Sequence, residues 1–249
     1  MIAMKLPLLL PFALALAAIV PAHAADLHVI AGGGIAGALN PIAAEFEKAS
    51  GHKVTIRYGT TPELIAMAKS SAFDAVVLPR EFLNDAAAAG RLAGATTDIA
   101  RVGLGVAVRA GAPKPDIATP EALKQALLRA KSIATVPASA AGAQVLKLFE
   151  RLGVQAEVKD KLQAAAGPAK LIEVVAAGQA ELGLFLINVL TAPGLDVVGP
   201  VPGALDQQIT YTTGATRDAA QAELARAFIT FLQTPPAKAV LKARGLTPL

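Results

Sequence analysis

Residues Leu27 to Glu45 read LHVIAGGGIAGALNPIAAE and combine the signals of a strand, a glycine turn and a helix. The apolar run 27–31 predicts a short strand, three glycines follow at 32–34, and a segment of helical period starts near Ala36. A turn between such a strand and helix leaves backbone N–H groups free at the positive end of the helix dipole. The stretch therefore predicts an anion-binding turn, and a tight turn without a ligand is the alternative.

The first 24 residues have the pattern of an export signal. Met1 to Lys5 carry one lysine, residues 6–20 are almost wholly apolar, and Ala22-His23-Ala24 fits an A-x-A cleavage site. The apolar run is shorter than the ~20 residues that span a bilayer. We expect residues 1–24 to be a signal peptide and the mature protein to be periplasmic, while a retained membrane anchor is the alternative.

The composition excludes several classes of site. There is no cysteine, so thiolate nucleophiles and thiolate metal sites are excluded, and the three histidines lack metal-ligand spacing. The formal net charge is +4, but the basic residues are dispersed and aromatic residues are few, which argues against nucleic acid and modestly favours small anions. We expect no metal, no cofactor and no nucleic-acid partner.

The next elements repeat the pattern of a strand followed by a helix. Strands are predicted at 53–57 and 74–78, with a helix over 36–50 and another that opens at the Thr60-Thr61 loop. This order favours a parallel sheet covered by helices, in which ligands bind beyond the carboxyl ends of the strands. Arg80 follows the third strand and is a candidate carboxylate partner there, with an exposed surface arginine as the alternative.

A second α/β unit follows, and its loops offer two further polar groups. Ser139 lies between a predicted strand at 132–136 and a helix at 143–152, and Asn188 ends a buried strand at 181–187. The strand at 209–215 and the last helices are expected to return to the first unit. The predicted division is 25–104 plus 191–249 for lobe I and 105–190 for lobe II.

Motifs along the whole mature chain carry a family resemblance. They are FEKASGHKVTIRYGTTPEL, DAVVLP, RVGLGVAVRAGAPKPDI, SIATVPASAAG, AAGQAELGLFLINVL and LDVVGPVPGALDQQITYTTGA. Together with the glycine turn, they resemble periplasmic solute-binding proteins of the molybdate-binding type. The resemblance implies the type II binding-protein fold, with two α/β lobes, a ligand cleft between them, a membrane ABC permease as partner and a monomeric state.

The same resemblance bears on the ligand, because family residues that hold the oxyanion are changed. The first serine pair of true molybdate binders aligns with Gly33 and Gly34, and their late tyrosine aligns with Leu186. A hydroxyl is kept at Thr60 or Thr61. An organic carboxylate is therefore favoured over molybdate. The expected ligand-binding residues are Gly33, Gly34, Thr60, Thr61, Arg80, Ser139 and Asn188.

Three functions remain open at this point. The favoured one is the substrate-binding protein of an ABC-type importer that binds a small organic anion by lobe closure. Molybdate or tungstate transport is the second, since backbone N–H groups alone can hold a tetrahedral oxyanion. The segments GAPKPDIATPEALKQALLRAKSI and GPVPGALDQQITY resemble a molybdate-like subgroup of this family, to which at least one aconitate isomerase is similar. The third function is therefore an aconitate isomerase on the same scaffold. Catalysis is less favoured, since the cleft loops offer no histidine or cysteine and few carboxylates.

Overall fold

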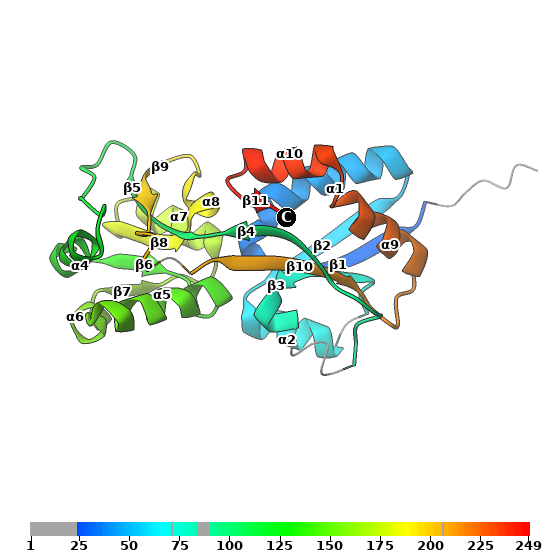
Figure 1. The fold of residues 1–249 in the computed structure, drawn as a ribbon, viewed down its shortest axis with the longest axis horizontal. Coiled ribbons are helices and arrows are strands. Elements are labelled where there is room, and N and C mark those ends of the chain that lie inside the picture. The colour runs from blue at the N-terminus through cyan, green and yellow to red at the C-terminus, as the bar shows by residue number, and fades with distance from the viewer. Residues whose placement is uncertain (1–23, 71, 84–89, 206) are drawn as a thin grey trace, which may run out of the picture.

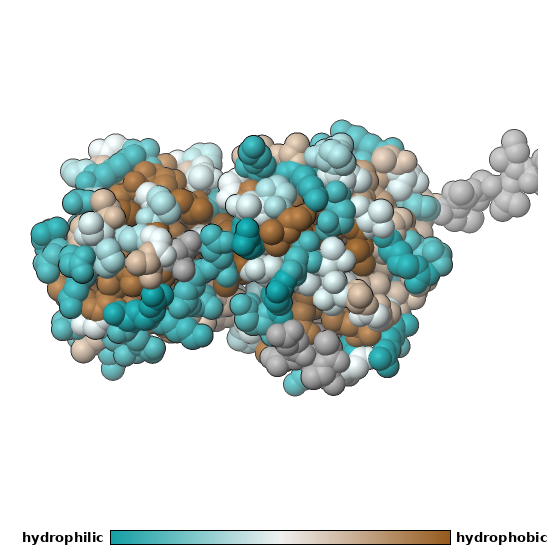
Figure 2. All heavy atoms as spheres, viewed as in Figure 1, coloured by the Kyte–Doolittle hydropathy of each residue, from teal (hydrophilic) through white to brown (hydrophobic). Residues whose placement is uncertain are grey.

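The computed structural model describes residues 24–249 except 71, 84–89 and 206. It has two lobes joined by two extended crossings (Figure 1). A waist separates the lobes on the outer surface, and hydrophilic residues lie along part of it (Figure 2). The predicted signal peptide, apart from Ala24, lies outside the described residues. Within these ranges, no helix is both long and apolar enough to cross a membrane.

The first lobe is built on a six-stranded sheet. Its order is β11-β4-β10-β3-β1-β2. The strands are β1 (Asp26–Gly32), β2 (Lys53–Gly59), β3 (Ala75–Pro79), β4 (Thr97–Val102), β10 (Ile209–Ala215) and β11 (Thr247–Pro248). Strand β1 is parallel to β2 and β3, as the strand–helix alternation predicts, whereas β10 runs antiparallel between β3 and β4.

Helices cover both faces of this sheet. They are η1 (Gly33–Ile35), α1 (Ala36–Ser50), α2 (Thr61–Ser70), α9 (Ala222–Phe231) and α10 (Pro235–Ala243). Helix α1 buries Leu39, Ile42 and Phe46 and ends at Gly51, whose φ of 72° is a left-handed cap that glycine adopts without strain. The Phe46 ring packs edge-on against Phe228 of α9, with 5.2 Å between centroids, and α10 lies beside α1 (Figure 1).

The second lobe has a five-stranded sheet in the order β7-β6-β8-β5-β9. Its strands are β5 (Leu104–Arg109), β6 (Ile133–Thr135), β7 (Leu162–Ala164), β8 (Leu182–Leu186) and β9 (Leu195–Pro200). Its helices are α4 (Pro120–Arg129), α5 (Ala140–Leu152), α6 (Gln155–Lys159), α7 (Pro168–Ala176) and α8 (Ile187–Leu190). The two mixed α/β sheets confirm the predicted two-lobed fold.

The chain crosses between the lobes twice. It leaves the first sheet at Gly103, between β4 and β5, and returns between β9 and β10. The crossings touch, since the N–H of Val201 donates to the carbonyl of Leu104 at 3.0 Å. Strand β9 pairs with β5, so residues 195–200 belong to the second sheet and not to the first, where the sequence had placed them.

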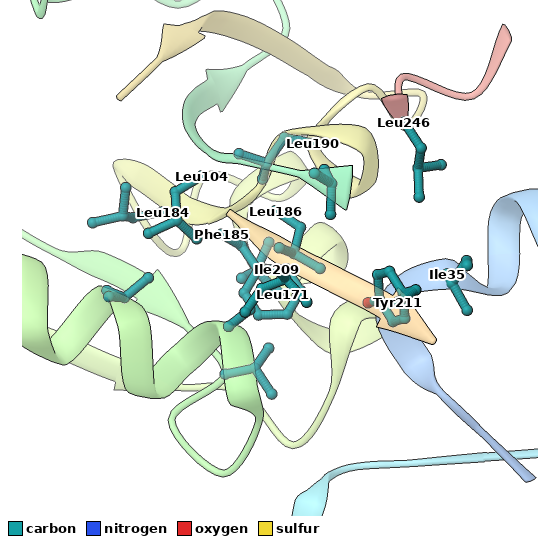
Figure 3. Packing of buried hydrophobic residues seen from close by; sticks show 14 of the residues in the cluster. Ile35, Leu104, Leu171, Leu184, Phe185, Leu186, Leu190, Ile209, Tyr211 and Leu246 are labelled. Carbon is teal, nitrogen blue, oxygen red and sulfur yellow. The ribbon is translucent and has the colours of Figure 1, made fainter. Parts of the chain in front are cut away.

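The apolar core is continuous from one lobe to the other. The main cluster joins Ile35, Tyr211 and Leu246 of the first lobe to Leu104 and Leu186 of the second (Figure 3). A separate cluster on the α2 face of the first sheet contains Ile30, Leu64 and Val76. Because buried residues of both lobes are in one cluster, the lobes are packed against each other in this structure.

We expect Gly142→Ala to destabilise the protein by about 3 kcal/mol or more, because a new Cβ would overlap with the backbone of Val136 and lie 2.7 Å from Pro137 Cα. Chemical denaturation measures the loss. The matched control is Gly37→Ala in α1, where a Cβ meets nothing within 4 Å. Equal stability of the two variants would contradict this packing.

Candidate ligand-binding cleft

The glycine turn lies where the two lobes meet. Strand β1 ends at Gly32, one 3-10 turn follows, and α1 begins at Ala36 with no side-chain cap and no acidic residue in its first turn. A cavity lies beside it. It is bordered by Gly32, Gly33, Gly34, Gly59, Thr61, Leu64 and Pro79 of the first lobe, by Ser139, Ala140, Ala141, Phe185 and Leu186 of the second, and by Ile209 and Tyr211 of the returning chain.

This cavity has a volume of about 30 Å³, which is room for about one water molecule. The second lobe has closed directly onto the turn. A Cβ built at Gly34 would overlap with Leu186 Cδ1 and would lie 2.5 Å from the hydroxyl oxygen of Tyr211. Ligand entry therefore requires the lobes to separate.

Two hydrogen bonds connect the lobes at this cavity. The N–H of Thr61 donates to the carbonyl of Ala138 at 3.1 Å, and Asn188 Nδ2 donates to the carbonyl of Gly34 at 2.8 Å. Asn188 Oδ1 is buried and has no hydrogen-bond partner among the described residues. One buried acceptor at the contact between the lobes is therefore left unpaired. Both predicted residues, Thr61 and Asn188, therefore act here as contacts between lobes.

Thr60 does not border the cavity, and both of its hydrogen-bond donors are engaged by Glu63 of the same lobe. Glu63 Oε2 accepts hydrogen bonds from the Thr60 N–H at 2.6 Å and from its hydroxyl at 2.8 Å. The bond to the Thr60 N–H is the carboxylate half of a capping box, in which residue N3 of a helix reaches back to the N-cap backbone N–H. The backbone hydrogen bond from Thr60, followed by the hydroxyl, lowers the pKa of Glu63 from its ordinary value.

Arg80 is also turned to an internal carboxylate. Its guanidinium forms an ion pair with Asp98, with Nε 3.2 Å from Oδ1, and the same oxygen accepts from the Thr212 hydroxyl at 2.5 Å. The Arg80 side chain is 55% exposed and does not border the cavity. In this closed arrangement Arg80 is paired with Asp98 and does not border the cavity, so its predicted role as a carboxylate partner stays a prediction.

Ser139 borders the cavity and caps α5. Its Oγ accepts from the Gly142 N–H at 2.9 Å and donates to the Val136 carbonyl at 2.8 Å. The hydroxyl proton of Ser139 is therefore engaged in a hydrogen bond within the second lobe. What remains for a ligand on this side is the open start of the helix at Ala140 and Ala141.

Tyr211 also borders the cavity, although the sequence favours a structural position for it over a place in the site. This residue is 2% exposed, and its hydroxyl lies on the side of the ring turned toward Leu186 and Phe185 (Figure 3). No described residue forms a hydrogen bond with that hydroxyl, and burial raises the pKa of Tyr211 above its ordinary value. The only sequence signal was an aromatic residue at the start of the returning strand, and its place beside the turn depends on long-range pairing with Pro79.

The donors at the cavity are neutral. Among the described residues that border it, none carries a charge, and the groups present are backbone N–H groups, the Thr61 and Ser139 hydroxyls and the Tyr211 phenol. In the described ranges, no three histidine, aspartate or glutamate side chains gather closely enough to hold a metal. Such neutral donors stabilise an anion without a counter-ion.

Glycines 32, 34 and 37 also have the G-x-G-x-x-G spacing of dinucleotide-binding turns. Such sites place a carboxylate near the end of the second strand, where it binds a ribose hydroxyl. Strand β2 instead ends in Arg57-Tyr58-Gly59. The turn has the geometry for an anion but lacks the acidic residue that a dinucleotide site requires.

We expect Gly34→Ala to hold the lobes apart, because its methyl group would overlap with Leu186 in the closed form. Small-angle scattering of the ligand-free protein would then give a larger radius of gyration than the wild type. Gly37→Ala is the control and leaves the radius unchanged. Identical scattering from all three proteins would contradict close packing at Gly34.

We expect the stability contribution of Glu63 to depend on pH. Its pKa is lower in the folded protein than in the unfolded chain, so the carboxylate stabilises the fold at neutral pH and loses this effect as the pH falls through the folded-state value. Glu63→Gln then lowers the melting temperature at about pH 7 and has a smaller effect at about pH 3. An equal loss at both pH values would show that the hydrogen bonds do not depend on the charge.

Three comparisons with known proteins agree with this architecture. An aconitate isomerase from Pseudomonas sp. is 34% identical over 233 residues, which cover 90% of this chain and 88% of that protein. The molybdate-binding protein ModA of Azotobacter vinelandii is 28% identical over 235 residues, 90% of each chain. The sulfate-binding protein SubI of Mycobacterium tuberculosis superposes with a TM-score of 0.75 at 16% identity, over 90% of this chain and 87% of that one, which shows a shared fold.

A family model also matches this chain. It extends over residues 27–247 and so includes the glycine turn, both sheets and both crossings. The chain belongs to the bacterial extracellular solute-binding protein family.

Proposed function

We propose that this protein binds a small organic anion, with at least one carboxylate, in the cleft between its lobes. In this proposal it is exported to the periplasm and delivers the ligand to a membrane ABC permease. The ligand-binding groups are the backbone at Gly33 and Gly34, the Thr61 loop, the start of α5 behind Ser139, and Asn188. Tyr211 adds a phenol donor at the base of the cleft.

The observation that carries this proposal is the mixed character of the cavity wall. The glycine turn borders the same cavity as Phe185 and Leu186, and Gly34 lies directly against Leu186. A tetrahedral oxyanion presents only oxygen atoms, so an aliphatic wall would desolvate part of it without a hydrogen bond. An organic carboxylate presents both an oxygen end and a CH surface, which suits a site with both kinds of wall.

The mechanism we propose is ligand-linked closure. The 30 Å³ cavity is too small to admit a ligand, so the ligand first meets the glycine turn with the lobes apart. Contacts from the second lobe then exist only after the lobes close around the ligand, and those contacts stabilise a closed form with more space between the lobes than the 30 Å³ cavity. The crossings at Gly103 and at residues 201–208 are where the backbone changes direction.

The second candidate function is isomerisation of a tricarboxylate such as aconitate, which the similarity to an aconitate isomerase favours. Such an enzyme needs a group that takes a proton from carbon. Glu63 is the carboxylate beside the turn, since its Oε2 would lie 3.4 Å from a Cβ at Gly59. Its lowered pKa keeps it ionised but makes it a weak base, and the raised pKa of Tyr211 keeps that phenol neutral.

Molybdate or tungstate transport is the third candidate, and the similarity to a molybdate-binding protein favours it. It requires backbone N–H groups to hold the oxyanion without the hydroxyls that are missing at Gly33 and Gly34. The three candidates make different demands on the ligand, so a comparison of ligands separates them.

We expect citrate or trans-aconitate to raise the melting temperature of the purified protein, and molybdate, tungstate, sulfate and phosphate to have little effect. A ligand at 100 times its dissociation constant adds about 2.7 kcal/mol, which is a shift of about 5–10 °C for a chain of this size. Arg80→Ala is the comparison variant, and we expect it to keep the shift, because Arg80 pairs with Asp98 and does not border the cavity. A shift with molybdate alone would overturn the carboxylate proposal.

The same samples test catalysis. Conversion of trans-aconitate to its cis isomer, followed by proton NMR, would favour the isomerase. Binding of trans-aconitate without conversion would favour transport.

A further inference from the structure

A second and larger hollow opens on the other side of the glycine turn. We call it the outer groove. Its volume is about 490 Å³, within the range of small-molecule sites, and its borders include Gly33, Gly34, Tyr58, Pro168, Asn188 and Arg244. Gly33 and Gly34 border both this groove and the small inner cavity. The two spaces therefore meet at the turn that we propose binds the first carboxylate.

Both lobes build the outer groove. Gly33, Tyr58 and Arg244 come from the first lobe, whereas Pro168 and Asn188 come from the second. The chain next to Arg244 already lies against the second lobe, since a Cβ at Gly245 would be 3.5 Å from Asn188 Cα and Cβ. A ligand in this groove would contact both lobes at once, as a ligand that stabilises closure must.

The outer groove carries a positive charge and no negative charge on the described residues that border it. Arg244 is the only charged residue among the described residues that border it, and none of them is aspartate or glutamate. Its guanidinium is exposed and forms none of the ion pairs found within the described ranges, in contrast to Arg80. Helices α1 and α7 also begin at this groove, and neither has an acidic residue in its first turn.

We propose that the outer groove is the second half of the ligand site and that Arg244 binds a second carboxylate there, so that the substrates are di- and tricarboxylates. The inference rests on the proposed function and narrows its substrate class. A planar guanidinium donates two parallel hydrogen bonds to one carboxylate, which gives both affinity and orientation. The first carboxylate stays at the glycine turn, and the carbon chain passes Gly33 and Gly34.

The ordinary role for a basic residue at this position is stabilisation of the end of α10, because cations interact favourably with helix C-termini. Lys242 provides the control, since it lies in the last turn of the same helix, is exposed, and does not border the groove. Removing either charge alters the helix end and the net charge equally. Of these two residues, only Arg244 borders the groove and can contact a ligand there.

The test is calorimetric titration of the wild type, Arg244→Ala and Lys242→Ala with citrate and with the monocarboxylate butyrate. We expect Arg244→Ala to weaken citrate binding at least about tenfold, equivalent to about 1.4 kcal/mol, and to change butyrate binding less than about twofold. Lys242→Ala leaves both affinities within about twofold of the wild type.

The outcomes separate the two proposals. If citrate binds the wild type and both variants equally, the assignment of Arg244 is overturned while carboxylate binding stands. If Arg244→Ala weakens citrate and butyrate by the same factor, the arginine acts through general charge, and the assignment also fails. If neither carboxylate binds the wild type, the proposed function fails and this inference fails with it.

Discussion

Gly34 has no side chain, and the close packing of the two lobes at the cleft requires this. The missing side chain lets Leu186 of the second lobe and the Tyr211 hydroxyl approach the backbone of the first lobe, where a Cβ would overlap with the leucine. The Gly34 carbonyl is in turn the acceptor for Asn188 Nδ2. One residue thus provides the close packing, the hydrogen bond between lobes and the turn at which an anion would bind. This is why the buried core runs unbroken between the lobes.

Two carboxylates engage groups that the sequence offers to a ligand. Glu63 accepts hydrogen bonds from the Thr60 N–H and hydroxyl, and Asp98 forms an ion pair with Arg80. Thr60 and Arg80 both follow strand ends, which made them candidates in the sequence. The described residues that border the inner cavity are uncharged, and Arg244 is the one charged residue among the described residues that border the outer groove. This division of donors favours a ligand that is charged at both ends and carbon in the middle.

The parts of the fold that could be predicted are those that depend on residues close together in the sequence. The strand, glycines and helix of residues 27–45, and the repeated strand–helix order after them, gave the parallel core of the first sheet and the two-lobed family. Glu63 could have been read as the end of a capping box with Thr60, since that spacing is local. The pairing of Arg80 with Asp98 could not, because it depends on the placement of β3 and β4 on either side of β10, which comes from a distant part of the chain. The same holds for Tyr211 and for β9, whose partners are set by tertiary packing.

An organic carboxylate bound at the glycine turn between the lobes should be sensitive to a side chain at Gly34. Calorimetric titration of citrate into the wild type, Gly34→Ala and Gly167→Ala measures this. A methyl group at Gly34 would take up the space beside Leu186 and the Tyr211 hydroxyl, where the first carboxylate is proposed to bind. A Cβ at Gly167 meets nothing within 4 Å, and Gly167 borders neither the inner cavity nor the outer groove. We expect citrate to bind the wild type and Gly167→Ala with similar affinity and to bind Gly34→Ala at least about tenfold more weakly. Equal affinity for all three proteins would contradict carboxylate binding at this turn.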